Sequence, residues 1–435
     1  MTASLVDDRF ISDKLLRQIA LCATILVPLG LLHAFVLAEI CIAITDLAFL
    51  YRCTRMRDWG WLRHGWVRIA LVWWVWLIIC STPIPLLGLG SAGWKMGFTQ
   101  ALVIIRFIVF TAALQDWVLT TTQSRRIAVW TLILSAFWIA LESWQQYFTG
   151  HNIFGDPRWS DGSLTGPFWK PRAGQLYAHI LYPAILPTVA ILLASSRRLA
   201  YVGGLLLAIL GLITSVLIGQ RMGLALNAMG AVVAALFLSR LRLPVIAGVI
   251  AAAVFLLVTP IISPPTYHKL VGETHKNMGH FWLSPYGQLY IRGTQMGLQS
   301  PLHGWGYNGF REHCPEPRFD AGIPRLSLPA TQLDLGACNL HPQNYYVQAF
   351  VDAGLPGFIL FTLLCLCWFK DMLAGLWRTG DPLRIALFIA VLTFLWPLAS
   401  TDEFPAAYMV GWFFFVLGLG YAAKTSPIGA NIGSR

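Results

Sequence analysis

Long apolar segments alternate with short polar connections along the whole chain. Each apolar segment holds roughly 20 residues, the length that a helix needs to cross a hydrocarbon core of about 30 Å. We predict twelve spans, over residues 15–33, 35–51, 66–87, 97–117, 127–147, 174–195, 199–217, 221–238, 243–262, 355–373, 384–400 and 404–423. The pattern therefore predicts an all-α, polytopic membrane protein in which residues 1–435 form a single integral membrane domain.

One polar segment, residues 263–340, is far longer than the others and separates spans nine and ten. Its many Pro and Gly residues argue against an independent compact domain. The stretch "PYGQLYIRGTQMGLQSP" has helical character, and Pro301 with "GWGYNG" would end that helix. Its aromatic and polar residues favour an ordered loop with short helices, and loops of this length are commonly functional.

The charged residues are few and lie mainly in the connections. The chain is 57% hydrophobic and 12% charged, with a formal net charge of +11. Most Lys and Arg residues fall in the connections on the side of the N-terminus, so the positive-inside rule places both termini in the cytoplasm and residues 263–340 outside. We exclude a nucleic-acid-binding role, because the positive charges are spread over many connections and form no basic domain.

The cysteines and histidines bear on the compartment and on the cofactors. Of the eight cysteines, Cys314 and Cys338 lie in the long loop and the others lie in or near predicted spans. An oxidising compartment would allow these two to form a disulfide, which we predict over two free thiols. The ten histidines are scattered, and none lies in an HExxH, CxxC or DxD context. We therefore expect a reaction without a metal ion or other cofactor.

Several cations are expected at the outer face of the membrane. Arg221 lies in the tight turn "LIGQRMGL", where the positive-inside rule disfavours an arginine. A guanidinium at a helix N-terminus can bind phosphate oxygens with paired donors. Snorkelling to lipid headgroups is the alternative for Arg221.

Three further cations could complete such an anion site. Arg292 lies on the predicted loop helix, where a solvated helix face is the alternative. Lys170 and Arg172 follow two aromatic residues in "GPFWKPR", where an interfacial anchor is the alternative. Charged residues inside the spans, namely Arg106, Glu39 and Asp46, are expected to form structural pairs.

A histidine precedes a polar stripe at the end of the long loop. In "HPQNYYVQAFVDAGLPGF", Tyr345, Gln348 and Asp352 follow His341 at offsets that lie on one helical face. We predict that His341 begins a short helix with one water-facing side, which "GLPG" ends before span ten. An imidazole there could accept a proton from a hydroxyl, although a cap or surface residue is the common alternative. Asp402 and Glu403, before span twelve, are expected on the same side.

Three stretches in succession resemble the landmarks of the O-antigen ligase and polymerase superfamily. They are "LIGQRMGL", "LYIRGTQMGLQSPLHGWGYNGF" and "HPQNYYVQAFVDAGLPGFILF". In that family an Arg begins a span, a large periplasmic loop carries a second Arg, and a His-initiated helix closes the loop. The family pattern places Asn directly after the His, whereas two residues intervene here before Asn344.

The resemblance implies an enzyme of the bacterial inner membrane with a periplasmic active site and a fold like that of the C-type membrane glycosyltransferases. Its donor would be an undecaprenyl-pyrophosphate-linked glycan, and its acceptor, in the ligase, the lipid A–core. His341 would be the catalytic base, and Arg221, Arg292, Lys170 and Arg172 would bind the pyrophosphate. The residues expected to bind or orient substrate are Gln220, Asn344, Tyr345, Gln348 and Asp402.

The span count and the single long loop resemble the ligase most. The alternatives within the superfamily are the O-antigen polymerase and the protein O-oligosaccharyltransferase, which use the same donor. A transporter or flippase is the alternative of a different class, but the internal repeats and broken helices that it would need are not seen. A peptidoglycan-type polymerase would use a loop aspartate such as Asp320 or Asp334 and would leave the His341 stretch unexplained.

Overall fold

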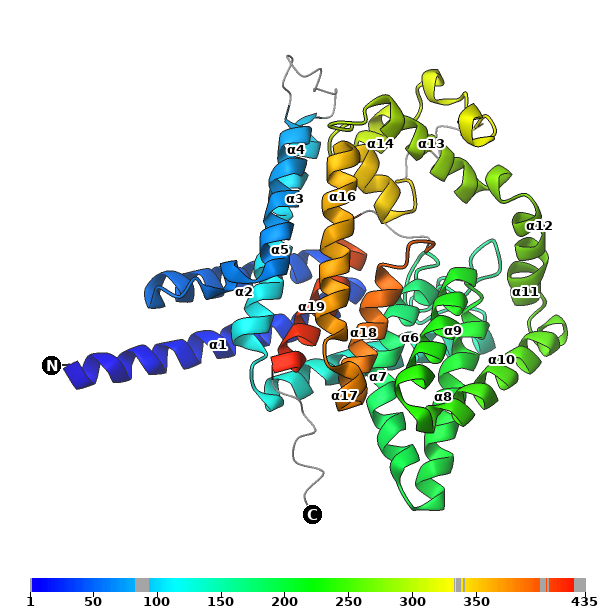
Figure 1. Cartoon of the computed structure of the whole chain (residues 1–435). Helices are drawn as coiled ribbons and strands as arrows, with labels where there is room; N and C mark the ends of the chain where they lie inside the picture. Colours follow the sequence, from blue (N-terminus) through cyan, green and yellow to red (C-terminus); the bar gives the residue numbers. More distant parts are fainter. Residues whose placement is uncertain are drawn as a thin grey trace.

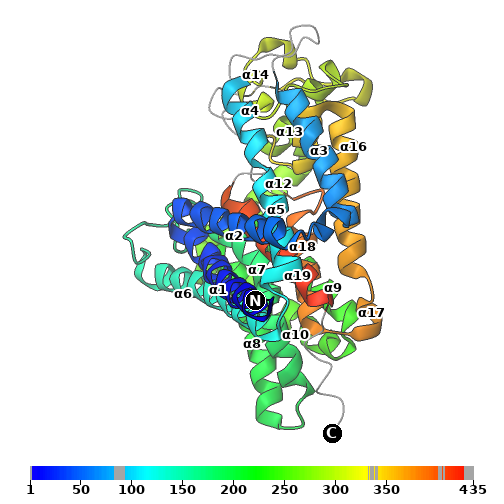
Figure 2. The same cartoon turned by 90° about the vertical axis from the view of Figure 1, so that its left-hand side faces the viewer.

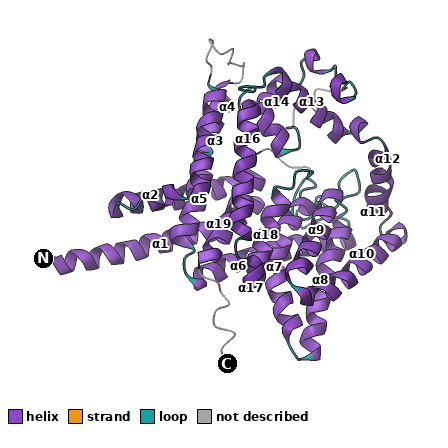
Figure 3. Cartoon of the chain, in the orientation of Figure 1, coloured by secondary structure: helices purple, strands orange, loops and turns teal. Residues whose placement is uncertain are grey.

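The computed structural model describes residues 2–82, 94–331, 333, 338, 341–399, 404 and 407–425. Most of these residues are helical, and the described part of the chain contains no strand beyond two isolated bridges (Figure 3). Before the long loop come α1 (Thr2–His33), α2 (Phe35–Met56), α3 (Gly65–Ser81), α4 (Trp94–Val103), α5 (Ile105–Ala113), α6 (Thr122–Thr149), α7 (Ala173–Ala194), α8 (Arg198–Ile218), α9 (Arg221–Phe237) and α10 (Arg242–Ile262).

The long loop and the helices after it complete the chain. The loop contains α11 (Pro264–Tyr267), a π-helical turn (His268–Gly272), α12 (Glu273–Gly279), α13 (Pro285–Gln299), α14 (Gly309–His313) and short 3-10 turns. After it come α16 (Tyr345–Leu373), α17 (Leu376–Thr379), α18 (Pro382–Phe394) and α19 (Ala407–Thr425). The loop is therefore ordered and carries short helices, as predicted.

The structure confirms an all-α polytopic membrane protein. Among the described residues, 7 helices are long and apolar enough to cross a membrane, and α3, α9, α18 and most of α19 are shorter apolar helices. Each of the twelve predicted spans coincides with a helix, although span four is divided into α4, α5 and a π-helical turn over Leu114–Val118. The predicted intramembrane pairing is present for two of the three residues, because Arg106 Nε lies 2.8 Å from Glu39 Oε2. Among the described residues, Asp46 Oδ1 is buried and has no hydrogen-bond partner.

The centre of the molecule is formed by α18 and α19. Their side chains are buried on all faces, as Ile389 and Trp412 show. A helix that is apolar all round is stable only where other helices or lipid surround it. By contrast, α10 exposes most of its apolar side chains, including Leu257 and Ile261, which suits a helix that faces lipid.

The connections gather at two opposite ends of the bundle. At one end, the Leu164 N–H donates to the Ile218 carbonyl (2.9 Å), which joins the 151–172 connection to the end of α8. At the other end, the ring centroids of Phe237 and Trp377 are 4.1 Å apart, which joins the end of α9 to α17. The long loop lies at the first end (Figures 1 and 2). The end of α19 meets the end of α16, where Lys424 Nζ lies 3.1 Å from Asp371 Oδ1.

The long loop forms an arch over the first end of the bundle. In Figure 1 α11 and α12 rise from the end of α10, and α13 and α14 lie at the top beside α16. Close packing fixes α13 on α16, because a Cβ on Gly297 would lie 2.3 Å from the Phe350 ring and one on Gly293 would lie 2.6 Å from Val347. Only glycine permits this approach.

A backbone break divides α16 into two parts. Ala353 and Gly354 have non-helical dihedrals, and Gly354 has φ 64°. The "GWGYNG" turn satisfies the carbonyls that the break leaves free, because Trp305 N–H donates to Val351 O (2.8 Å) and Gly306 N–H to Asp352 O (2.9 Å). The prediction that "GLPG" ends a short helix before span ten is therefore confirmed, and "GWGYNG" is a structural turn.

Candidate active site

The start of α9 lies against the start of α7. A Cβ on Gly223 would lie 2.5 Å from the Gly174 carbonyl oxygen, so the two helices approach at backbone distance. Gln220 joins them, because its Oε1 accepts the Gln175 N–H (3.0 Å) and its Nε2 donates to the Pro171 carbonyl (2.5 Å). Two helix N-termini, each with a partial positive charge, therefore lie side by side at the loop end.

Arg221 begins α9 at this junction. Its side chain is 23% exposed, and its Nη2 lies 3.8 Å from Glu273 Oε2 of α12. A charge-assisted hydrogen bond is about 2.7–2.9 Å long, so this ion pair leaves the guanidinium donors open. Arg221 could therefore bind an anion that reaches the junction.

Lys170 and Arg172 approach the same junction from the 151–172 connection. Arg172 immediately precedes α7, and its Cζ lies 4.2 Å from the centroid of the Tyr408 ring. Lys170 Nζ lies 4.3 Å from the Trp169 ring. Since Pro171 between them binds Gln220, the structure brings both cations to the α7 and α9 N-termini. Their role as pyrophosphate ligands stays a prediction.

His341 lies just before α16 and does not begin the helix, contrary to the prediction. Asn344 is the N-cap, because its Oδ1 accepts the N–H groups of Tyr346 (2.9 Å) and Val347 (3.1 Å). An Asn side chain can accept hydrogen bonds from these first helical amides, whereas the imidazole of His341 is too far away. The helix therefore begins after Asn344 and not at His341. The His341 side chain is partly exposed, and its Nδ1 accepts the Gln343 N–H (3.3 Å).

The polar stripe on α16 is buried, so the prediction of a water-facing side is wrong. Tyr345, Gln348 and Asp352 do share one helical face, but each is only 4% exposed. Gln348 forms two hydrogen bonds with the backbone of Phe404, donating to its carbonyl (2.7 Å) and accepting its N–H (2.8 Å). The stripe therefore holds Phe404 in place, and any contact of these three residues with substrate stays a prediction.

The segment between α18 and α19 also joins the start of α16 to the start of α9. Asn344 Nδ2 donates to the Pro397 carbonyl (2.7 Å). Two residues later, Ala399 packs in one buried cluster with Leu226 and Met222 of α9. His341 and Arg221 therefore lie on elements that meet on the same short connection. Asp402 and Glu403, which follow it, lie outside the described residues.

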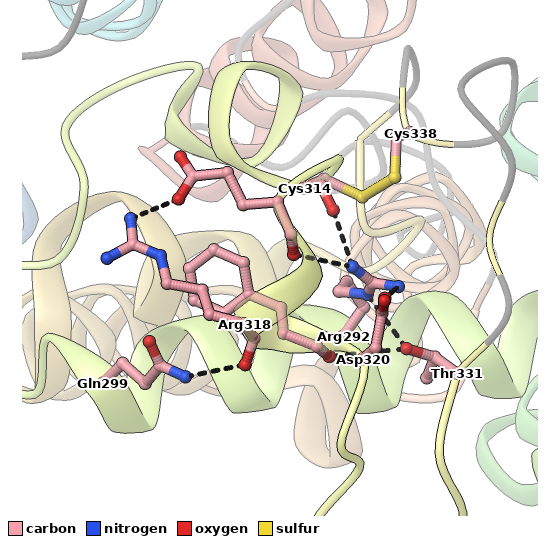
Figure 4. Close-up of polar contacts among 9 residues, drawn as sticks. Arg292, Gln299, Cys314, Arg318, Asp320, Thr331 and Cys338 are labelled. Carbon is pink, nitrogen blue, oxygen red and sulfur yellow. Dashed lines mark hydrogen bonds and ion pairs between the residues drawn. A yellow bond between two sulfur atoms is a disulfide. The ribbon is translucent and has the colours of Figure 1, made fainter.

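Arg292 lies in a different environment, inside the part of the loop around α13. Its side chain is 1% exposed, and it donates to Thr331 Oγ1 (3.0 Å), to the Cys314 carbonyl (2.7 Å) and to the Asp320 carboxylate (Figure 4). A fully paired and buried guanidinium orders the protein that surrounds it. Its predicted role as a pyrophosphate ligand stays a prediction, and in this structure its donors are engaged within the loop.

The predicted disulfide is confirmed. Cys314 and Cys338 are bonded, with their Cα atoms 5.4 Å apart, and both are buried beside Arg292 (Figure 4). Met296, Phe310 and Phe319 pack around them. We call residues 285–331 together with Cys338 the loop lobe.

Among the described residues, no group of three His, Cys, Asp or Glu side chains could hold a metal ion.

The sequence was compared with models of known protein families. Residues 183–362 match the model described as O-antigen ligase. The chain carries an O-antigen ligase domain. This domain is typical of the O-antigen ligase and polymerase superfamily, whose members are enzymes of the glycosyltransferase type. A search of curated proteins found none that matches this chain.

The O-antigen ligase domain includes most of the candidate site. It extends from α7 through α9 and the loop lobe to the second part of α16, so it contains Arg221, Arg292 and His341. Lys170 and Arg172 lie before it, and the connection that carries Pro397 lies after it. The site is therefore completed by elements on both sides of the domain.

Three charged residues near Arg221, namely Glu273, Lys269 and Asp161, were not predicted from the sequence. Lys269 Nζ lies 2.5 Å from Asp161 Oδ2 and 3.5 Å from Glu273 Oε2. Burial raises the pKa of Asp161, but the Lys269 and Ser163 hydrogen bonds outweigh this effect and leave the pKa below its ordinary value. The i, i+4 spacing of Lys269 and Glu273 was the available signal for the pair.

Proposed function

We propose that this protein is an O-antigen ligase, which transfers a glycan from undecaprenyl pyrophosphate to the lipid A–core. The observation that carries the proposal is the junction of the α7 and α9 N-termini, where Arg221 is partly exposed and Lys170 and Arg172 are close. Two helix dipoles and three cations suit a diphosphate, which carries several negative charges. Asn344, the N-cap of α16 and three residues after His341, is joined to the same region through Pro397.

In the proposed reaction, His341 accepts the proton of the acceptor hydroxyl. The hydroxyl oxygen bonds to the anomeric carbon as the bond from that carbon to the pyrophosphate oxygen breaks, so the anomeric centre is inverted. The bond pair leaves with the pyrophosphate, whose growing charge Arg221 stabilises. The step needs the imidazole within about 3 Å of the hydroxyl.

The Gln343 amide bears on which nitrogen takes the proton. Because its N–H points at Nδ1, the neutral His341 ring carries its own proton on Nε2 in this state. The acceptor hydroxyl must therefore replace the 3.3 Å amide contact at Nδ1, or the ring must change tautomer. Gln343 has φ 56°, a conformation that is costly for a residue with a side chain, so a rearrangement of this peptide would relieve strain.

Arg292 has an indirect role in this proposal. It ties Cys314, Asp320 and Thr331 to α13, and α13 is fixed on the first part of α16 by Gly293 and Gly297. Because Pro342 also packs on Gly293, the order of the loop lobe decides where the His341 stretch lies. We therefore assign Arg292 to the positioning of His341.

The compartment follows from the same proposal. A disulfide in the loop lobe suits an oxidising space such as the periplasm. Arg240 and Arg378, which lie on the connections at the opposite end, suit the cytoplasmic side of an inner membrane. Donor and acceptor both have lipid anchors, so a site at the outer membrane surface would reach both.

The proposal is tested by supplying two acceptors to the purified protein in liposomes that contain a lipid-linked glycan. A ligase transfers the glycan to lipid A–core and does not lengthen the lipid-linked glycan. Chain growth on the lipid-linked glycan, with lipid A–core unmodified, would instead indicate the polymerase. Transfer to neither acceptor by folded protein would contradict both assignments.

A further inference from the structure

We propose that Glu273 competes with the donor for Arg221, and that Lys269 is a further cation for the donor's diphosphate. This inference rests on the proposed function, because it assumes that a diphosphate binds at the start of α9. Lys269 and Glu273 lie in the long loop and are not among the site residues that the sequence predicts.

Four charged side chains form a continuous chain across the start of α9. Arg221 Nη2 lies 3.8 Å from Glu273 Oε2, Lys269 Nζ lies 3.5 Å from the same oxygen, and Lys269 Nζ lies 2.5 Å from Asp161 Oδ2. Their side chains are 15–34% exposed, so an ion from solution can reach each of them. One carboxylate, Glu273, is therefore shared by two cations.

The net charge of Arg221, Lys269, Asp161 and Glu273 is zero while no donor is bound. Two cations and two carboxylates sum to zero, so a diphosphate would enter a site that already contains its competitor. The Asp161 carboxylate is firmly held, because Ser163 N–H and Lys269 both donate to it. Glu273 has the longer contacts, so it is the carboxylate that the diphosphate would replace.

The two residues differ in how firmly their segments are attached. The first segment of the long loop, residues 263–270, is firmly attached around Lys269. Thr266 and Leu270 are buried, and Arg158 donates a hydrogen bond to Ser263 Oγ (3.1 Å). By contrast, α12, which begins at Glu273, buries no residue, and neither does the turn Phe281–Leu283. Few buried contacts mean a low free energy of local opening.

These observations give each residue a part in donor binding. Lys269 stays in place on its anchored segment and turns from Glu273 towards the incoming phosphate. Glu273 loses its contact with Arg221, the ion pair that joins residues 273–283 to α9. Donor binding therefore loosens α12, and the ion pairs re-form when the pyrophosphate leaves.

The test measures binding of undecaprenyl pyrophosphate to the full-length protein in nanodiscs, together with hydrogen exchange of α12. Glu273→Gln should bind about threefold more tightly, which is the scale of a partly exposed ion pair, and Lys269→Gln should bind at least threefold more weakly. The control Glu316→Gln makes the same charge change in the loop lobe and should leave affinity unchanged. In the wild type, the lipid should speed exchange over residues 273–283, and Glu273→Gln should show that fast exchange without lipid.

The outcomes separate this inference from the proposed function. Unchanged or weaker binding by Glu273→Gln, or unchanged binding by Lys269→Gln, would overturn the inference. The proposed function would still stand if the wild type binds the lipid tightly and Arg221→Gln abolishes that binding. Slower exchange of α12 with lipid would also overturn it. If the wild type does not bind the lipid, the proposed function and this inference fail together.

Discussion

The start of α9 and the loop lobe each contain an arginine in a family-like stretch, yet the two environments are opposite. Arg221 is 23% exposed and has one long ion pair, whereas Arg292 is 1% exposed and donates to a carbonyl, a hydroxyl and a carboxylate within the lobe. The first guanidinium is open to a ligand and the second is part of the framework. Under the proposed function, Arg221 therefore has a ligand-binding role and Arg292 a positioning role, although the two stretches give similar sequence signals.

The largest loss of activity is expected from a change at His341, which lies between the loop lobe and α16. Replacing it with Ala removes the proposed base, and general base catalysis typically contributes about 100-fold or more. We expect His341→Ala to lower the rate of transfer to lipid A–core in liposomes by at least that factor, with an unchanged thermal midpoint. His151→Ala changes an exposed histidine at the same end and should retain full activity. Full transfer by His341→Ala would remove the base from the mechanism.

The disulfide should matter for the loop lobe and little for the start of α9. It joins residues 24 apart, so its loss in Cys314→Ser, Cys338→Ser should destabilise the lobe by about 3 kcal/mol. Limited proteolysis should then cut the lobe rapidly, while Cys22→Ser, which changes an exposed free thiol, should behave as the wild type. Equal protease resistance of the double variant would show that the lobe is held by its other contacts.

Arg292 should have a similar but smaller effect. In Arg292→Gln the buried acceptors lose a charged donor, so local opening of α13 should become easier by about 2 kcal/mol. Hydrogen exchange of α13 reports this directly. The control Arg325→Gln changes an exposed arginine of the same lobe. If Arg292→Gln instead abolishes activity with α13 fully protected, Arg292 is a ligand of the donor after all.

The smallest effect is a dependence on pH near Asp161. Because its pKa is below the ordinary value of 3.8, the ionised carboxylate stabilises the fold above that value, and the stabilisation is lost as the pH falls through the lowered pKa. The exchange protection of Leu164 N–H should therefore fall as the pH drops below about 3.8. The protection is expressed relative to that of Asp161→Asn, which should show no such step. A step in the variant too would assign the effect to another group.

The sequence predicted the elements better than their surroundings. Hydrophobicity was enough for the spans, because a buried or lipid-facing helix needs an apolar surface whatever its neighbours are. Periodicity placed Tyr345, Gln348 and Asp352 on one face, but it could not show that Phe404 covers that face. The helix was predicted to begin at His341, but its N-cap is Asn344, because the capping side chain determines where the helix begins.

The role of an arginine depends on its acceptors, and these are distant in sequence. Arg292 is paired with groups at positions 314, 320 and 331, and Arg221 with position 273. No local pattern around either arginine records these partners. The sequence could therefore indicate which cations were unusual but not which one faces a ligand.

The most direct test of the account compares the two ends of α9. The rate of transfer by Arg221→Gln should be about 100-fold below that of the wild type at equal protein abundance, because one donor to the leaving charge is lost. Arg240→Gln makes the same change at the opposite end of the helix, where the side chain is exposed, and should keep the wild-type rate. Equal rates for the two variants would contradict the assignment of the donor site to the start of α9.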